Sequence, residues 1–322
     1  MVSAQIDLRN WPDASPKAAK SADLPSTEDL PLVSLVIPSY NQGKYLEYAI
    51  KSVLNQGYPN LECFVIDGGS ADGSVAILRE YSNLLTYWES EPDQGQSHAI
   101  NKGWHKANGK YLWWLNADDM LTPSSLITAV SFLEANPDID LIYGNVYRID
   151  SSGRLLDEFA YRDFDLDEFL IGDHDISQAG ALTRRSVLDR IGMLNERYHY
   201  VMDREFWLRV GLSGGKLAHA HAPLALFRIH DETKTQAGSP DAVKERYELY
   251  SWLMEHPNLS SHVRSNTARI WSSVHLDSAR VYMKCGAFTN SLGELRRAVR
   301  NRPSSVVSSS FWASGVLSAL GL

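Results

Sequence analysis

The chain has few cysteines and no excess of basic residues. Its 322 residues include two cysteines, Cys63 and Cys285, and 31 lysines and arginines against 39 aspartates and glutamates, which gives a net charge of -8. Two isolated thiols have neither the spacing of a metal site nor a disulfide framework, so they indicate a reducing compartment. Because a nucleic-acid-binding protein needs a basic face to displace counterions, the charge balance argues against a nucleic-acid partner.

Long apolar runs are also lacking. No stretch approaches the roughly 18 continuous apolar residues of a membrane span. Residues 1–31 are polar, contain proline and serine, and lack the apolar core of a signal peptide, so we expect a poorly ordered lead-in. The short apolar tail, SFWASGVLSALGL, is interpreted as the end of a packed helix, and a membrane-surface foot is the alternative.

The first half of the chain contains a regular alternation of strand and helix patterns. Short β-rich runs are found at residues 33–37, 63–66, 85–90, 111–116 and 140–150, and helical patterns lie between them. This alternation predicts a parallel α/β sheet. After about residue 155 the alternation fades. Residues 216–230 then predict a strand pair in which His219 and His221 are ordinary strand residues, and the chain is predicted helical from about residue 241.

Polar side chains follow several of the predicted strand ends, where a parallel sheet binds its ligands. These residues are Ser39, Tyr40, Asn41, Asp67, Asp93, Asp118 and Asp119. Two adjacent aspartates at the end of a buried strand repel each other unless a positive charge lies against them. Mg²⁺ or Mn²⁺ would neutralise the pair and still accept phosphate oxygens as ligands. The alternative is that one aspartate only caps the following helix.

Three stretches together resemble a known family: VSLVIPSYNQGKYLEYAIKSVLNQGYPNLECFVIDGGSADGS, EPDQGQSHAINKG and GKYLWWLNADD. From about residue 32 to 147, and again over 176–210 and 223–230, the chain is similar to family 2 glycosyltransferases. That resemblance implies a GT-A fold, a Rossmann-like and mostly parallel sheet flanked by helices. We therefore predict a GT-A domain at residues 32–237, with a donor half at 32–150 and an acceptor half at 151–237, followed by a helical C-terminal region at 238–322.

The resemblance also implies roles for the matching residues. Those implied to bind a nucleotide-diphosphosugar donor are Pro38, Ser39, Tyr40, Asn41, Asp67, Asp93, Lys102 and Asp118. Asp119 and His230 are implied as ligands of Mn²⁺ or Mg²⁺, and Arg228 would stand near the leaving group. For Lys102 the alternative is a solvated helix face. A further set, which falls in the stretch that resembles the acceptor side, is Gln178, Arg184 and Arg185.

The segment MDREFWLR carries the predicted catalytic base. Asp203 matches the aspartate of the family's Glu-Asp element, with Met202 in place of the glutamate, and Glu205 is the fallback. A carboxylate within hydrogen-bond reach of an acceptor hydroxyl can take its proton during attack on the anomeric carbon. The alternative is an ordinary charged helix start.

The sequence thus predicts a metal-dependent, inverting, non-processive glycosyltransferase. It would move a sugar from a donor, with a leaning to UDP, to a hydroxyl of a glycan or lipid-linked acceptor in bacterial surface polysaccharide synthesis. We expect a cytoplasmic protein, either free or peripheral at the inner membrane through its tail. The alternatives are a non-catalytic nucleotide-sugar or glycan binder, a sugar-nucleotide nucleotidyltransferase, and a glycoside hydrolase, which would explain Asp203 but not the acidic pair.

Overall fold

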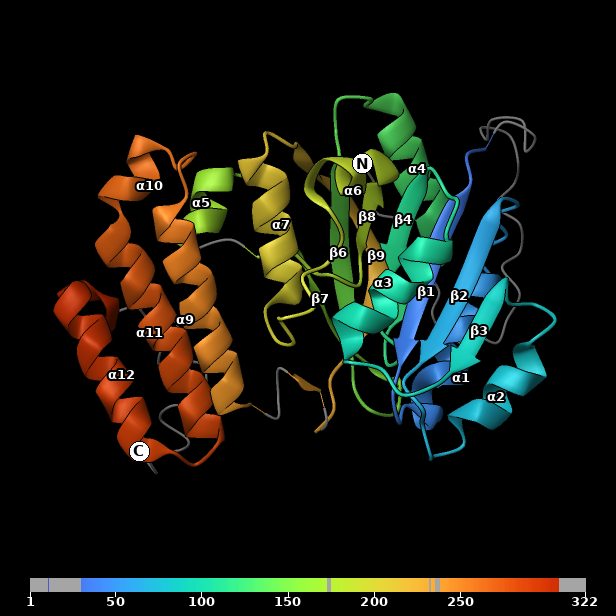
Figure 1. Cartoon of the computed structure of the whole chain (residues 1–322), viewed down its shortest axis with the longest axis horizontal. Coiled ribbons are helices and arrows are strands. Elements are labelled where there is room, and N and C mark those ends of the chain that lie inside the picture. Colours follow the sequence, from blue (N-terminus) through green and yellow to red (C-terminus); the bar gives the residue numbers. More distant parts are fainter. Residues whose placement is uncertain (1–10, 12–29, 173–174, 232, 235–237, 307–322) are drawn as a thin grey trace. The chain divides into compact units, whose positions relative to one another are not determined.

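The chain divides into two compact units in the computed structural model, which describes residues 11, 30–172, 175–231, 233–234 and 238–306 (Figure 1). The sheet unit comprises Met1–Asp163, Ile176–Arg197 and Arg209–Arg228, and the helical unit comprises Phe164–Asp175, Tyr198–Leu208 and Ile229–Leu322. The apolar tail and nearly all of the predicted lead-in lie outside the described residues. The predicted domain boundaries at residues 31, 150 and 237 stay predictions.

Four parallel strands form the first half of the sheet, in the order β3-β2-β1-β4 (Figure 1). They are β1 (Val33–Ser39), β2 (Leu61–Asp67), β3 (Tyr87–Ser90) and β4 (Tyr111–Trp114). The helices between them are α1 (Gly43–Leu54), α2 (Ser74–Tyr81) and α3 (Gln96–Lys106). The predicted alternation is confirmed here, and it aligns the carboxyl ends of these strands along one edge.

The second half of the sheet is mixed in direction and continues the order as β4-β8-β6-β9-β5. Its strands are β5 (Met120–Leu121), β6 (Leu141–Ile149), β7 (Leu155–Phe159), β8 (Ala181–Arg184) and β9 (Leu217–Arg228), and its helices are α4 (Ser125–Ala135) and α6 (Arg185–Ile191). Strand β8 is antiparallel to both β4 and β6, whereas β9 is parallel to β6. The predicted α/β class with helices flanking the sheet is confirmed, and the antiparallel pairings make the sheet mixed where a mostly parallel one was predicted.

The strand pair predicted at residues 216–230 is wrong, because this segment is the single strand β9. The chain distorts at His221, whose φ is 50°, and the β6–β9 register shifts opposite that point, but the strand continues. Gly144 of β6 permits this distortion, since a Cβ there would lie only 2.5 Å from the Ala222 carbonyl oxygen. A bulge therefore replaces the turn that the sequence suggested.

The core of the sheet unit lies between the sheet and α1. Val33, Leu35 and Ile37 of β1 are fully buried together with Leu46 and Ile50 of α1. Every residue of β1 is buried, as expected for a strand covered on both faces. Each such side chain contributes about 1.5–3 kcal/mol on burial, so the core holds the strand ends in a defined geometry.

The helical unit contains α5 (Leu166–Ile171), α9 (Pro240–Glu255), α10 (Ser261–Ser265), α11 (Thr267–Lys284), α12 (Phe288–Asn301) and the 3-10 turn η2 (Pro303–Val306). The helix α7 (Met202–Leu212) contains the division between the two units. Helices α11 and α12 pair antiparallel: Ser272 donates to the Ala298 carbonyl and Ser291 to the Ala279 carbonyl. The predicted helical character from residue 241 is confirmed for the described residues. Within that same part of the chain, no helix combines the length and apolar character needed to cross a membrane.

Candidate active site

The loops that follow β1 and β2 are bound to each other by Asn41. Its backbone N–H donates to Ser70 Oγ at 2.7 Å, and its Oδ1 accepts the Ala71 N–H at 3.0 Å. Asn41 has a φ of 52°, a left-handed conformation that asparagine tolerates better than most residues. Gly68 N–H also donates to the Ser39 carbonyl at 2.8 Å. The two strand ends therefore form one rigid frame.

Asp67 closes this frame from the end of β2. Its side chain is fully buried; Oδ2 accepts Ser70 N–H at 2.8 Å and Ser90 Oγ–H at 2.6 Å, and Oδ1 accepts Ser70 Oγ–H at 2.5 Å. An ionised carboxylate has about four acceptor positions, so one is left after these three bonds. Asp67 thus links the ends of β2 and β3 and can still accept a ligand N–H.

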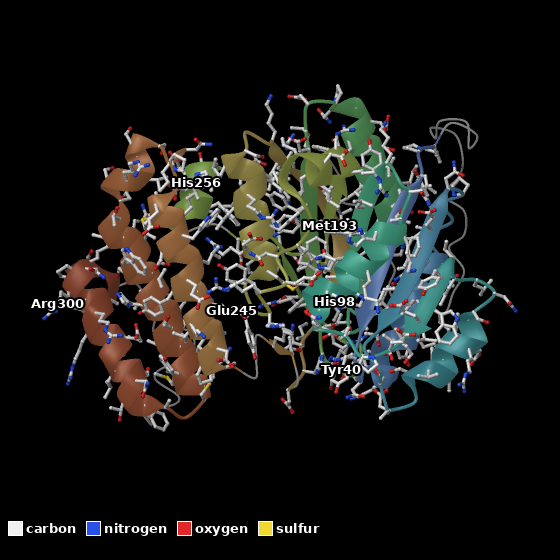
Figure 2. All side chains as sticks on the ribbon, viewed as in Figure 1. Tyr40, His98, Met193, Glu245, His256 and Arg300 are labelled. Atoms are coloured by element: carbon white, nitrogen blue, oxygen red, sulfur yellow. The ribbon has the colours of Figure 1, made fainter. Side chains whose placement is uncertain are left out.

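Ser39 and Tyr40 present a polar atom and a ring beside Asp67. Ser39 lies opposite Asp67 in the β1–β2 register, and its Oγ is buried without a hydrogen-bond partner among the described residues. Such a hydroxyl costs about 1–3 kcal/mol, which a bound polar group would recover. The Tyr40 side chain at the same strand end is 63% exposed (Figure 2). An exposed ring that follows a strand end paired with a buried acceptor is suited to a planar, hydrogen-bonding ligand.

Asp93 lies against the same frame from the loop between β3 and α3. Its Oδ1 accepts the Gly95 N–H at 2.7 Å, and its Oδ2 lies so near Gly68 that a Cβ on Gly68 would approach it to 2.9 Å. The absence of a side chain at Gly68 therefore lets this second carboxylate approach the β2 end. Asp93 and Asp67 are brought together as predicted from the strand ends.

The acidic pair Asp118–Asp119 follows β4 and is held by Arg228 of β9. Asp119 is 1% exposed, and its Oδ1 accepts the Arg228 backbone N–H at 2.9 Å, while Arg228 Nε donates to the Asp118 carbonyl at 2.8 Å. Burial and the neighbouring Asp118 charge raise the pKa of Asp119 well above its usual range, in spite of the opposing effect of Arg228. The protein therefore buries a carboxylate whose charge a cation would stabilise.

Asp203 lies in the first turn of α7, in the helical unit. Loss of solvent around its carboxyl group, together with the charge of Asp175, raises the pKa of Asp203 to about 6. A carboxylate with this pKa is mostly ionised at neutral pH yet more basic than an exposed aspartate, which suits a general base. Its position one turn before the buried Trp207 agrees with the predicted helix.

Glu245 of α9 holds the start of α7 (Figure 2). This buried carboxylate accepts the backbone N–H groups of His199 at 2.9 and 3.0 Å, Tyr200 at 2.7 Å and Val201 at 3.3 Å. Backbone N–H groups at a helix start lack partners within the helix, and a carboxylate also complements the helix dipole there. Glu245 therefore positions the turn that carries Asp203.

His230 is buried in the helical unit directly after β9. Its backbone N–H donates to Thr233 Oγ1 at 3.2 Å, and its carbonyl accepts the Thr233 N–H at 3.0 Å. These bonds shape the turn after β9. A shared metal role for His230 and Asp119 stays a prediction.

Comparisons with known proteins identify the family of this chain. The sequence profile of glycosyl transferase family 2 matches residues 34–192. An uncharacterized glycosyltransferase of Mycobacterium tuberculosis is 32% identical over 185 residues, which cover 56% of this chain and 70% of that protein. The chain belongs to glycosyl transferase family 2. An uncharacterized glycosyltransferase of Methanocaldococcus jannaschii is 30% identical over 189 residues, which cover 56% of this chain and 65% of that protein. The chain thus spans less than two thirds of the length of this relative.

Solved glycosyltransferases share the fold of this family 2 chain. TarS of S. aureus, in complex with UDP-GlcNAc, has a TM-score of 0.61 at 13% identity, covering 85% of this chain and 92% of that chain. The mannosyltransferase PcManGT from Pyrobaculum calidifontis, in complex with GDP-Man and Mn²⁺, has a TM-score of 0.55 at 16% identity, covering 92% and 83%. The predicted GT-A fold is confirmed.

Several residues that the family resemblance had marked make supporting contacts. Lys102 forms an ion pair with Glu89 on β3, so its predicted donor contact stays a prediction. The acceptor-side candidates each donate to a backbone carbonyl: Gln178 to Trp114 at 2.7 Å, Arg184 to Ile139 at 2.7 Å and Arg185 to Gly109 at 2.7 Å. These three hydrogen bonds stabilise the sheet and its adjoining loops in this family 2 protein.

Sequence reasoning missed several residues that hold the candidate side chains within each unit. Ser70 and Ser90 hold Asp67, Asn116 lies 3.4 Å from Asp119, and Glu245 holds α7. Ser70 had a signal, since it lies in the glycine-rich turn after a strand. Glu245 had none, because nothing in a helical pattern distinguishes a buried carboxylate from an exposed one.

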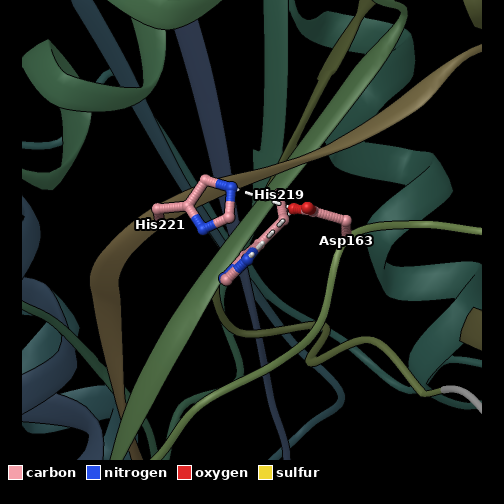
Figure 3. Close-up of side chains that lie close together, drawn as sticks. All are labelled: Asp163, His219 and His221. Atoms are coloured by element: carbon pink, nitrogen blue, oxygen red, sulfur yellow. Dashed lines mark ion pairs between the residues drawn. The ribbon is translucent and has the colours of Figure 1, made fainter.

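Two places in the sheet unit have the chemistry of a metal site. Asp118 and Asp119 offer the carboxylate oxygens that Mg²⁺ and Mn²⁺ prefer, and a cation would favour the ionised form of Asp119, whose pKa burial raises. In the described part of the chain, a carboxylate and two histidines also come within ligand distance of one another: Asp163, His219 and His221 (Figure 3). This second group lies on β9 and the segment after β7, away from the carboxyl edge that carries Asp118.

Proposed function

We propose that the protein is a metal-dependent, inverting and non-processive glycosyltransferase that uses a nucleotide-diphosphosugar. The observation that carries this proposal is the Asp118–Asp119 pair after β4, with Asp119 buried, on the sheet whose neighbouring strand ends carry the frame of Asn41 and Asp67. That combination offers a charged end for a diphosphate and a hydrogen-bonding end for a base. The fold neighbours TarS, in complex with UDP-GlcNAc, and PcManGT, in complex with GDP-Man and Mn²⁺, support the proposal of a nucleotide-diphosphosugar donor and of a metal ion.

The donor is proposed to lie along the carboxyl edge of the sheet. The Tyr40 ring stacks on the base, the Asp67 carboxylate accepts a base N–H, and the buried Ser39 hydroxyl gains a partner. Asn41 and Pro38 hold the backbone that carries these groups, and a UDP donor is preferred. The remaining donor contacts are assigned to Asp93, Lys102 and Asp118.

Asp119 and His230 are proposed to hold the divalent cation, Mn²⁺ or Mg²⁺. When bound, such a cation would stabilise the charge that develops on the diphosphate as the bond from the anomeric carbon to its oxygen breaks. Arg228, whose guanidinium lies 4.7 Å from the centre of the Tyr45 ring and donates to the Asp118 carbonyl, keeps the aspartate pair in place.

Asp203 is proposed as the catalytic base. Its carboxylate takes the proton of the acceptor hydroxyl while that oxygen bonds to the anomeric carbon. The bond from this carbon to the diphosphate oxygen breaks with its electron pair, and the nucleoside diphosphate leaves. Because attack and departure take place on opposite faces, the anomeric configuration inverts.

The acceptor is proposed to be a glycan or lipid-linked sugar in bacterial surface polysaccharide synthesis. In this setting residues 32–237 form the GT-A domain, with donor and acceptor halves that meet near residue 150. Helix α9 of the C-terminal region supports the start of α7, as the Glu245 contacts indicate. A peripheral membrane contact through the tail concerns residues 307–322, which lie outside the described residues.

Thermal unfolding with UDP, GDP, dTDP and CDP, each with and without Mn²⁺ or Mg²⁺, tests the donor site. A ligand that binds only the folded protein raises the midpoint according to its concentration over its Kd. We expect one nucleotide to stabilise the protein only with metal, and Asp119→Ala to abolish this effect. If no nucleotide shifts the midpoint with either metal, the donor assignment is refuted. Binding without hydrolysis or transfer of any sugar would instead favour the non-catalytic binder.

A further inference from the structure

Asp163, His219 and His221 converge in the sheet unit, from two segments far apart in sequence (Figure 3). His221 Nε2 lies 2.9 Å from Asp163 Oδ1, and His219 Nδ1 lies 3.9 Å from the same oxygen. The nearest ligand atoms of all three side chains lie within 4.8 Å of one another. A tetrahedral ion with bonds of about 2.0–2.1 Å needs ligand atoms roughly 3.3 Å apart, so small rotations of the side chains suffice.

Asn145 determines the tautomer of His219. The Asn145 Oδ1 accepts the Tyr161 backbone N–H at 3.0 Å, and its Nδ2 donates to Glu158 at 3.1 Å, which sets the orientation of the amide. His219 Nε2 lies 2.8 Å from the same Oδ1 and must therefore be the donor. A neutral His219 then directs the lone pair of Nδ1 toward the cluster, as a metal-ligating histidine with an outer-shell partner does.

The segment that carries Asp163 is held by β6, the strand that also contains Asn145. Tyr143 Oη donates to the Arg162 carbonyl at 2.6 Å, and Tyr161 N–H is bound by Asn145 as above. The Tyr143 ring also stacks on the His219 ring, with centroids 5.3 Å apart and planes 18° from parallel. The backbone before Asp163 and the ring of His219 are thus both fixed before any ion binds.

His221 adopts a strained conformation within this group. Its φ of 50° is uncommon for a residue other than glycine, and its ring centroid lies 4.4 Å from that of His219. The side chains of His221 and Asp163 are 67% and 79% exposed, whereas that of His219 is 3% exposed. One ligand is therefore buried and rigid, and two are open to an ion from solvent.

We propose that Asp163, His219 and His221 form a three-ligand site for a transition-metal ion such as Zn²⁺, with water in the fourth position. Imidazole nitrogen favours Zn²⁺, Co²⁺, Ni²⁺ or Cu²⁺ over Mg²⁺, so the site differs in metal class from the Asp118–Asp119 pair. It is also separate in space. Arg228, which contacts that pair, follows His221 by seven residues along β9, which is about 23 Å of extended strand. The bound ion connects strand β9 with the segment that follows β7.

Zn²⁺ titration of the full chain, freed of metal with a chelator, tests the site. The background is Cys285→Ser, since Cys285 is an exposed thiol that could bind the ion by itself. We expect one equivalent of Zn²⁺ to bind and to raise the unfolding midpoint. His221→Ala and Asp163→Asn should each weaken binding by more than about 100-fold, the upper end for the loss of an outer-shell partner. Asn145→Ala should weaken it about 10–100-fold.

Two control variants separate this site from others. His262→Ala removes an exposed imidazole from α10 and should leave the Zn²⁺ affinity unchanged. Asp119→Asn should also leave it unchanged, so failure of the proposed donor site does not affect the result. Co²⁺ should give a visible absorption band in the background protein and lose it in His221→Ala.

Either of two results would overturn the proposal. If the background protein binds no Zn²⁺, the cluster is only a histidine–carboxylate ion pair. If His221→Ala and Asp163→Asn bind Zn²⁺ as tightly as the background does, the ion binds elsewhere. Circular dichroism of each variant establishes that its fold is retained, which the exposure of both side chains leads us to expect.

Discussion

Replacing Glu245 by alanine should destabilise the protein and reduce its activity without touching any residue proposed to contact substrate. The side chain is 8% exposed and accepts the N–H groups of His199, Tyr200 and Val201, just before the turn that carries Asp203. Glu245→Ala leaves these donors without their carboxylate. The start of α7 then loses both its hydrogen-bond acceptor and a favourable charge near the helix dipole.

The expected size of the effect follows from the shorter contacts. A hydrogen bond to a charged group contributes about 1.5–3 kcal/mol, and the contacts to His199 and Tyr200, at 2.9 and 2.7 Å, are short enough to count fully. The 3.3 Å contact to Val201 adds little. We therefore expect Glu245→Ala to lower the free energy of unfolding by about 3–5 kcal/mol. Glu245→Gln, which keeps one acceptor oxygen, should cost about 2 kcal/mol.

Urea unfolding followed by circular dichroism measures the stability, and initial rates of sugar transfer measure activity well below each midpoint. Glu255→Ala is the matched control, because Glu255 is exposed on the same helix and should change stability by no more than about 0.5 kcal/mol. The rate should fall in Glu245→Ala and be retained in Glu255→Ala. Equal stability and rate in the two alanine variants would refute the assigned role of Glu245.

Three further predictions concern Asp203, Asp119 and Ser39. If Asp203 is the base, as proposed, its ionised form takes the proton and its pKa is raised to about 6, so the transfer rate should fall as pH decreases through about 6. Asp175→Asn removes a charge that raises this pKa and should move the fall to lower pH, so an unmoved profile in that variant contradicts the assignment. Asp119→Asn should abolish transfer. With chelator present, this variant should unfold at an equal or higher temperature than the wild type, because burial and the Asp118 charge disfavour the ionised form of Asp119. A clear loss of stability would refute this explanation. Ser39→Ala should stabilise the ligand-free protein by about 1 kcal/mol, because the buried Ser39 hydroxyl lacks a partner among the described residues. The same substitution should weaken nucleotide binding in the thermal assay. Tighter binding would exclude Ser39 from the donor site.

The parallel half of the sheet could be predicted because each of its elements has a local signal. Apolar runs of strand length alternate with helical periodicity, and polar residues at 39–41, 67, 93 and 118–119 follow the strands. The parallel register then brings the ends of β1 and β2 together, as the Ser39–Asp67 pairing shows. The aspartates of the candidate site could therefore be named without coordinates.

The mixed half could not be predicted, because strand pairing is a long-range property. Strand β8 enters between β4 and β6, although it follows both in the chain. A local pattern equally allowed a turn within residues 216–230, and only pairing with β6 along its length makes β9 a single strand. The choice depends on burial against a partner that the segment itself does not contain.

The sequence by itself determined which chemical groups this protein possesses and the order in which strands present them. Tertiary structure alone decided which groups meet: the Arg228 backbone reaches Asp119 across 109 positions, and Glu245 reaches Tyr200 across 45. The strand pattern could place His219 and His221 on one face, but not Asp163 beside them. The physical reason is that a buried polar group needs a partner of matching geometry, and packing of distant segments supplies that partner.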